Sequence, residues 1–103
     1  MSVFPEVLCV GMHFRGGAAK DIAASLSVGD TVTLEREPEN AYDEYAIRVL
    51  VGPEHIGYIE RGQAAWISPL MDEGGTATAF VTGHEERKRN LHPVLRIEVD
   101  DPS

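Results

Sequence analysis

One short segment of the sequence concentrates side chains that can recognise a ligand. Arg36, Asn40, Tyr42, Asp43 and Tyr45 lie within ten positions and supply hydrogen-bond donors, acceptors and two aromatic rings. Part of this set has a structural explanation. Asn40 and Asp43 are residue types that satisfy neighbouring backbone amides in turns, and Arg36 can pair with a nearby acid.

A functional interpretation of the same segment requires a planar ligand with hydrogen-bonding groups. A base of a single nucleic-acid strand can stack on Tyr42, while its terminal sugar meets Asn40 and Asp43. Stacking a base on an aromatic ring contributes about 1–3 kcal/mol and needs no basic surface. On composition alone the structural explanation is the more frequent one, so both interpretations stay open at this point.

The charge of the chain limits how such a ligand is held. The 103 residues include 17 Asp and Glu against 9 Lys and Arg, a net charge of −8. Proteins that grip a duplex use a basic face that releases counterions from the phosphates. We therefore expect any nucleic-acid contact to be local and geometric. An acidic surface can also steer a basic partner, so the alternative is a protein-interaction or adaptor domain without DNA binding.

Catalysis and metal binding find little support in the sequence. His13, His55, His84 and His92 lack the spacing of metal ligands, and no nucleophile–base pair or glycine-rich phosphate loop can be assembled. Cys9, the only cysteine, lies in an apolar run, which favours a buried, unreactive thiol. We predict no catalytic residue, no metal and no cofactor.

The elements that would position the polar segment are mostly short strands. Apolar runs and apolar–polar alternation predict strands over residues 7–14, 31–36, 45–51, 55–59, 76–82 and 91–99. Apolar residues at three- and four-residue spacing predict a helix over residues 60–71, with a break or kink near Ser68 because Pro69 lacks an amide proton. One or two helical turns over residues 18–26 and a polar hairpin tip over residues 83–90 complete the prediction.

Together these elements predict a mainly β fold, a small, partly open β-barrel of the oligonucleotide-binding or SH3-like type with about six strands and one or two short helices. The length fits a single domain over residues 1–103. No apolar stretch has the ~20 residues of a membrane span, and the N-terminus lacks the pattern of a secretory signal. We expect a cytoplasmic protein with no membrane partner.

Residues 34–49 carry a longer pattern, LEREPENAYDEYAIRV. It resembles the hallmark of the HIRAN domain family, a pattern of the form L-x-R-E-P-x-N-x-Y-D-x-x-A-I-x-V between two strands. Flanking stretches agree. Residues 10–14 are similar to the family's opening strand, Gly29 and Asp30 precede the second strand, and residues 56–64 are similar to the stretch after the motif. The resemblance covers residues 7–72, and the last two strands are less distinctive.

The resemblance implies a modified oligonucleotide-binding barrel that binds DNA. HIRAN domains occur alone in bacteria and phages and attached to DNA-remodelling ATPases in eukaryotes, and the best-understood members bind the 3′ end of single-stranded DNA. The implied function is a non-catalytic module that recognises single-stranded 3′ ends or DNA discontinuities in DNA repair or replication-fork processing. Its implied partner is a helicase, a nuclease or another DNA-processing protein.

The family motif also implies roles for individual residues of this sequence. Tyr42 would stack on the terminal base, Asn40 would hydrogen-bond the edge of that base, and Asp43 would accept a hydrogen bond from the 3′ hydroxyl. An acid in that place favours a 3′ hydroxyl over a 3′ phosphate. The other implied DNA-binding residues are Phe14 and Tyr58 against the bases, Arg61 on a phosphate, His13 at a position that is basic in end-binding members, and Arg36 of the motif.

Overall fold

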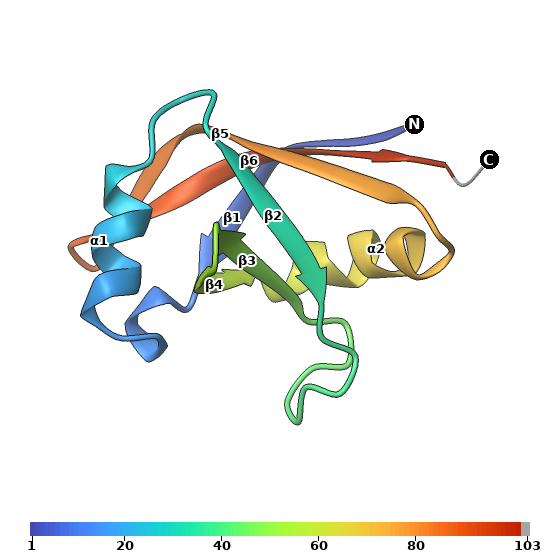
Figure 1. The fold of residues 1–103 in the computed structure, drawn as a ribbon, viewed down its shortest axis with the longest axis horizontal. Helices are drawn as coiled ribbons and strands as arrows, with labels where there is room; N and C mark the ends of the chain where they lie inside the picture. The colour runs from blue at the N-terminus through green and yellow to red at the C-terminus, as the bar shows by residue number, and fades with distance from the viewer. Residues whose placement is uncertain (102–103) are drawn as a thin grey trace.

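The computed structural model describes residues 1–101, apart from the side chain of His13, as six strands around a core with helices on its outside (Figure 1). The strands are β1 (Ser2–Val10), β2 (Thr31–Arg36), β3 (Ile47–Val51), β4 (Glu54–Ile59), β5 (Thr76–Arg87) and β6 (Asn90–Asp100). The helices are α1 (Gly17–Ser25), α2 (Arg61–Asp72) and the 3-10 turn η1 (Met12–Phe14).

All neighbouring strands pair antiparallel and close a barrel in the order β1-β4-β3-β2-β5-β6. Strands β5 and β6 pair along nearly their whole length. Two junctions are narrow by comparison. Strand β1 pairs with β4 through Cys9 and Val10, and β2 pairs with β5 through Thr31 and Val32. The predicted small β-barrel with two helices is confirmed, but its ring of strands is closed and not partly open, because β1 also pairs with β4 and β2 with β5.

Apolar residues alternate with polar ones along the strands, so one face of each strand is apolar and lies inside the barrel. Val49, Ile56, Leu95 and Ile97 are fully buried there, and burial of apolar side chains of this size stabilises the fold by about 1.5–3 kcal/mol each. Cys9 is buried in the same core, as predicted, and burial raises the pKa of its thiol to about 12. The thiol therefore stays protonated and unreactive at neutral pH.

The first strand is displaced from the predicted residues 7–14. It starts at Ser2 and ends at Val10, and Met12–Phe14 forms a 3-10 turn instead. Gly11 ends the strand with a φ of 81°, a backbone conformation that glycine adopts without steric cost. The turn carries Phe14 out of the sheet, so that its side chain is 81% exposed.

The predicted helix over residues 60–71 is present as α2, but the break near Ser68 is absent because α2 continues through Pro69 to Asp72. The helix is held by the two residues that come directly before the missing amide. Ile67 and Ser68 are fully buried, and the Ser68 hydroxyl donates a hydrogen bond to the carbonyl oxygen of Tyr45. This packing offsets the hydrogen bond that proline cannot make.

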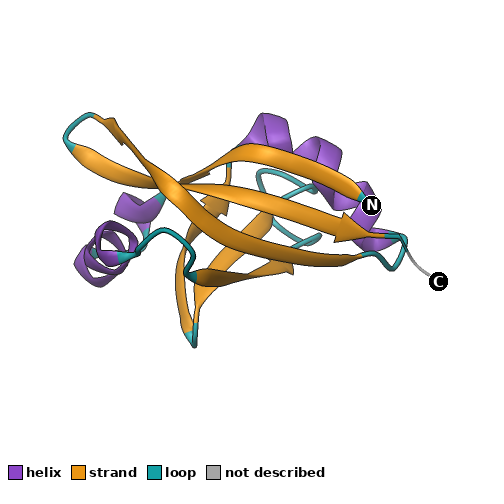
Figure 2. Ribbon diagram, turned by 90° about the horizontal axis from the view of Figure 1, so that it is seen from above, coloured by secondary structure: helices purple, strands orange, loops and turns teal. Residues whose placement is uncertain are grey.

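The helices and the loops leave the barrel in different directions. Helices α1 and α2 lie at opposite ends of the molecule (Figures 1 and 2), and residues 37–46 between β2 and β3 project away from the sheet (Figure 1). The predicted polar tip over residues 83–90 is mostly strand, since β5 and β6 extend to Arg87 and Asn90 and leave a turn of two residues. No helix in residues 1–101 is long and apolar enough to cross a membrane.

Candidate nucleic-acid interface

Arg36 anchors the projecting loop to the rest of the molecule. Its Nε and Nη2 atoms donate to the two carboxylate oxygens of Asp72 at 2.8 and 3.1 Å, at the end of α2. Nη1 and Nη2 also donate to the carbonyl oxygens of Ala46 and Glu44 at 2.7 and 2.9 Å. The side chain is only 13% exposed, so the guanidinium of Arg36 is used inside the protein.

Asn40 gives the loop its shape. Its Oδ1 accepts hydrogen bonds from the backbone amides of Tyr42 (2.9 Å) and Asp43 (3.0 Å), and its Nδ2 donates to Oε1 of Glu37 at 2.7 Å. This is the local bonding for which Asn is favoured in turns. The three contacts fix the backbone on both sides of residue 41 and thereby the direction in which Tyr42 points.

Tyr42 and Asp43 differ sharply in exposure although they are neighbours. The ring of Tyr42 is 89% exposed, whereas the carboxylate of Asp43 is largely covered. Asp43 Oδ1 accepts a hydrogen bond from the amide of Tyr45 at 2.9 Å. Its Oδ2 faces Nε of Arg61 at 4.0 Å, and the side chain of Arg61 is itself 79% exposed. The loop thus presents an aromatic ring and an acceptor oxygen beside a cation from the first residue of α2.

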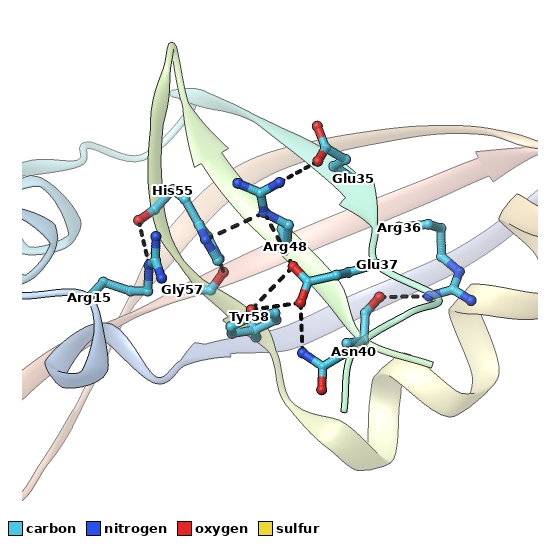
Figure 3. A network of polar contacts seen from close by, with 10 residues as sticks. Arg15, Glu35, Arg36, Glu37, Asn40, Arg48, His55, Gly57 and Tyr58 are labelled. Atoms are coloured by element: carbon cyan, nitrogen blue, oxygen red, sulfur yellow. Dashed lines mark hydrogen bonds and ion pairs between the residues drawn. The ribbon is translucent and has the colours of Figure 1, made fainter. Parts of the chain in front are cut away.

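Tyr58 belongs to a polar network that spans the barrel surface beside the loop (Figure 3). Its hydroxyl donates to the carboxylate of Glu37 at 3.2 Å, and that carboxylate also lies 3.5 Å from Nε of Arg48. Partial burial, and then the negative charge of Glu37, raise the pKa of the Tyr58 phenol. The phenol therefore stays protonated and is held as a donor, with its ring fixed in place.

His55 closes the other end of this network. Its Nε2 lies 2.8 Å from the carbonyl oxygen of Gly57, and its Nδ1 lies 3.4 Å from Nε of Arg48. A carbonyl needs a donor and a guanidinium needs an acceptor, so these contacts assign the proton of the neutral ring to Nε2. Burial, and then the charge of Arg15, lower the pKa of His55. The ring packs edge-on against Tyr58 with centroids 4.8 Å apart.

Two concavities meet at the loop. One of about 530 Å³ is lined by Phe14, Arg15, Asn40, Tyr42 and Tyr58. The other, of about 230 Å³, shares Asn40, Tyr42 and Tyr58 and adds Asp43, Arg61 and apolar atoms of Val10, Ala46 and Ile59. Aromatic walls with a few convergent polar groups are the usual lining of a site for an organic ligand.

The structure therefore brings six of the predicted site residues together, namely Phe14, Asn40, Tyr42, Asp43, Tyr58 and Arg61. Arg36 lies behind the loop, bonded to Asp72, and does not line either concavity. The side chain of His13 lies outside the described part of the chain. Among the described residues, no group of three or more His, Cys, Asp or Glu side chains is arranged to hold a metal.

Sequence reasoning missed Arg15, Glu37 and Arg48. Glu37 lies inside the motif that carries the family resemblance, and its place there is the one signal that could have marked it. Arg15 directly follows η1, and Arg48 lies on β3. They are far apart in the sequence and meet in the network only in the folded chain (Figure 3).

Comparisons with known proteins agree with this geometry. The family model for the HIRAN domain matches residues 5–99, nearly the whole chain. The chain belongs to the HIRAN domain family. A protein from Lactobacillus plantarum of known crystal structure is 31% identical, with 92% of each chain covered and a TM-score of 0.74. The HIRAN domain of human HLTF shares the fold at 19% identity and a TM-score of 0.71, over 95% of this chain and 74% of that one.

A shorter match connects this HIRAN domain with a much larger protein. A putative SWI/SNF-related matrix-associated actin-dependent regulator of chromatin subfamily A member 3-like 1 of Arabidopsis thaliana is 50% identical over 44 residues, which are 42% of this chain. The matched part is 5% of that protein's length. The similarity therefore covers less than half of this domain and a small part of that much longer protein.

Proposed function

We propose that this HIRAN domain is a non-catalytic module that binds the 3′ end of single-stranded DNA. The observation that carries the proposal is the exposed ring of Tyr42, held beside the acceptor oxygen of Asp43 and the cation of Arg61. These groups match the parts of a terminal nucleotide. A base stacks on Tyr42, the 3′ hydroxyl donates to Oδ2 of Asp43, and the 5′ phosphate of the same nucleotide meets Arg61.

The concavity beside Tyr42 extends this binding mode to the next base. It is lined by the exposed ring of Phe14 and by Tyr58, whose phenol donates a hydrogen bond to Glu37. Aromatic faces accept any base, so this arrangement recognises the end of a strand more than its sequence.

Asn40 and Arg36 take positioning roles in this proposal. The amide oxygen of Asn40 is committed to the amides of Tyr42 and Asp43, and its Nδ2 already donates to Glu37. Arg36 secures the base of the loop through Asp72. Because these contacts hold the loop in one conformation before the ligand arrives, binding loses less conformational entropy, and the affinity is higher.

A free hydroxyl at the 3′ end is the feature that the proposed site should select. We expect a short oligonucleotide with a 3′ hydroxyl to bind more tightly than the same strand with a 3′ phosphate, because Asp43 repels the phosphate. Tyr42→Ala should weaken binding of the hydroxyl form by about 1–3 kcal/mol, the size of one stacked base. Fluorescence anisotropy with the label at the 5′ end measures both effects.

Tyr45→Ala serves as the matched control, since it removes a second exposed tyrosine of the same loop that lines neither concavity. Equal affinity for the two strand ends, or equal affinity of the Tyr42→Ala variant and the unaltered protein, would overturn the proposal.

A module of this kind works beside an enzyme that acts on DNA. We propose a helicase, a nuclease or another DNA-processing protein as the partner, in repair or in replication-fork processing. The family resemblance supports this proposal, and so does the match to part of a large chromatin regulator.

A further inference from the structure

The turn between β5 and β6 is built from two residues that do not favour its backbone. Lys88 and Arg89 have φ values of 49° and 67°, and they are the only non-glycine residues in the described part of the chain with positive φ. Two positive φ values between paired strands are the geometry of a type I′ turn, for which Asn-Gly is the favoured sequence. The demands of folding therefore do not explain why two long cations occupy this turn.

The same two side chains also have no acidic partner within residues 1–101. Four of the nine Lys and Arg residues pair closely with carboxylates, in the pairs Arg36–Asp72, Arg48–Glu35, Arg87–Glu85 and Arg96–Glu98. Four others form no ion pair within residues 1–101, although the chain has 17 acidic residues: Arg15 at the candidate interface, and Lys20, Lys88 and Arg89. These side chains are exposed, so their charges are available to solvent or to a binding partner.

Lys20, Lys88 and Arg89 converge although they come from different elements. Lys20 of α1 and Lys88 line one depression of about 480 Å³ together with Arg87, Asn90 and His92. Lys20 and Arg89 line a second depression of about 290 Å³, which shares Lys20 and Asn90 with the first and also includes the acid Asp21. We call Lys20, Arg87, Lys88, Arg89 and His92 the tip surface.

The tip surface is connected to the candidate interface through η1. Met12, the first residue of η1, lines the second depression, and Phe14, the last residue of η1, lines the concavity beside Tyr42. A strand held at Tyr42 that passes Phe14 therefore reaches α1 and the β5–β6 turn next. Figure 1 shows η1 and α1 between the projecting loop and this turn.

We propose that the tip surface binds the phosphate backbone of a nucleic-acid strand whose 3′ end lies at the candidate interface. The direction of the strand in this proposal rests on the function proposed above. The binding of phosphates rests only on the cations of the tip surface. Lysine and arginine are the residues that neutralise phosphates in such contacts. The tip surface supplies the electrostatic attraction that the acidic remainder of the chain lacks.

The variant K88N/R89G tests this proposal without endangering the fold, because Asn-Gly suits the turn and should raise the melting temperature or leave it unchanged. For a strand of about 16 nucleotides with a 3′ hydroxyl, we expect weaker binding. The slope of log affinity against log salt should fall by about 1.4, since each lost phosphate contact on a single strand accounts for about 0.7. A dinucleotide with a 3′ hydroxyl should bind the variant and the unaltered protein equally.

Arg96→Gln is the control, because it removes a cation of β6 that is paired with Glu98 and lies outside the tip surface. It should leave the salt dependence of binding to the long strand unchanged. A second set of titrations uses an oligonucleotide in which the nucleotides beyond the 3′ end are paired as a duplex. Comparing it with the single strand shows whether the tip surface binds single-stranded or duplex nucleic acid.

The outcomes separate this proposal from the proposed function. If K88N/R89G and Arg96→Gln bind the long strand with the same salt dependence as the unaltered protein, the tip surface is not a phosphate site, whatever Tyr42→Ala does. If Tyr42→Ala has no effect while K88N/R89G weakens binding, the end-recognition mechanism is wrong and the tip surface stands. If no oligonucleotide binds at low salt, both proposals are overturned.

Discussion

Gly57 lies where β4 passes β1, at one of the two narrow junctions that close the barrel. A Cβ atom there would lie 2.5 Å from the carbonyl oxygen of Val10 and 3.1 Å from Sγ of Cys9. Neither neighbour can move easily, because one is backbone and the other is a buried core side chain. The absence of a side chain at position 57 is therefore a condition for closing β1 against β4.

We predict that Gly57→Ala lowers the free energy of unfolding by about 1–3 kcal/mol, the usual cost of overpacking a core. Denaturation in urea measures this change. Gly62→Ala in α2 is the control, since a Cβ there meets nothing within 4 Å. It should leave stability unchanged or raise it by up to about 1 kcal/mol, the difference in helix propensity. Equal stability of the two variants would contradict this account of the junction.

At the scale of the elements, η1, β3 and β4 are joined by the network around His55. Arg15 follows η1, Arg48 lies on β3, and Tyr58 and His55 lie on β4, with Glu37 at the start of the loop. The cations Arg15 and Arg48 lower the pKa of His55, while the carboxylate of Glu37 raises it, and burial lowers it most of all. The neutral ring is thus the form that the folded protein favours.

This balance predicts a pH dependence with a definite sign. The pKa of His55 in the folded protein lies below its ordinary value of 6.5, so its contribution to stability is present above pH 6.5. That contribution is lost as the pH falls through the folded pKa. NMR titration of the ring proton should show a midpoint below 6.5. Arg15→Gln should move that midpoint upward by removing a cation, and a midpoint at or above 6.5 in the unaltered protein would refute the assignment.

At the scale of the whole molecule, a net charge of −8 is combined with a site whose lining has three aromatic rings and one carboxylate but only two cations, Arg15 and Arg61. Such a site releases few counterions when it binds. For a dinucleotide with a 3′ hydroxyl, log affinity should therefore fall with log salt with a slope of about 0.7 or less, the value for one phosphate.

Titration of that dinucleotide at several salt concentrations measures the slope. Arg61→Gln should flatten it further, because Arg61 lies beside Asp43 and is the cation that we propose to contact the phosphate. A slope of several units for the dinucleotide would show instead that a broad electrostatic surface holds it.

The sequence by itself determined the class of fold and which loop carries the residues of the candidate interface. Alternation of apolar residues marked the strands because one face of each strand must enter the core, and β2 was predicted with its observed bounds, Thr31–Arg36. The pattern over residues 34–49 and its flanking stretches carried the family resemblance, which the match over residues 5–99 confirms. Both properties are local, so they can be read along the chain.

The tertiary structure decided what depends on distant partners. Pro69 stays within α2 because Ser68 is anchored by Tyr45, from another part of the chain. Arg36 turned inward because Asp72 lies beside it in space, although 36 positions separate the two in sequence. Lys20 and the β5–β6 turn line one depression although they lie far apart in the sequence. A sequence reports the chemistry of each side chain, but closing the barrel decides which charges are already neutralised and which remain available to a ligand.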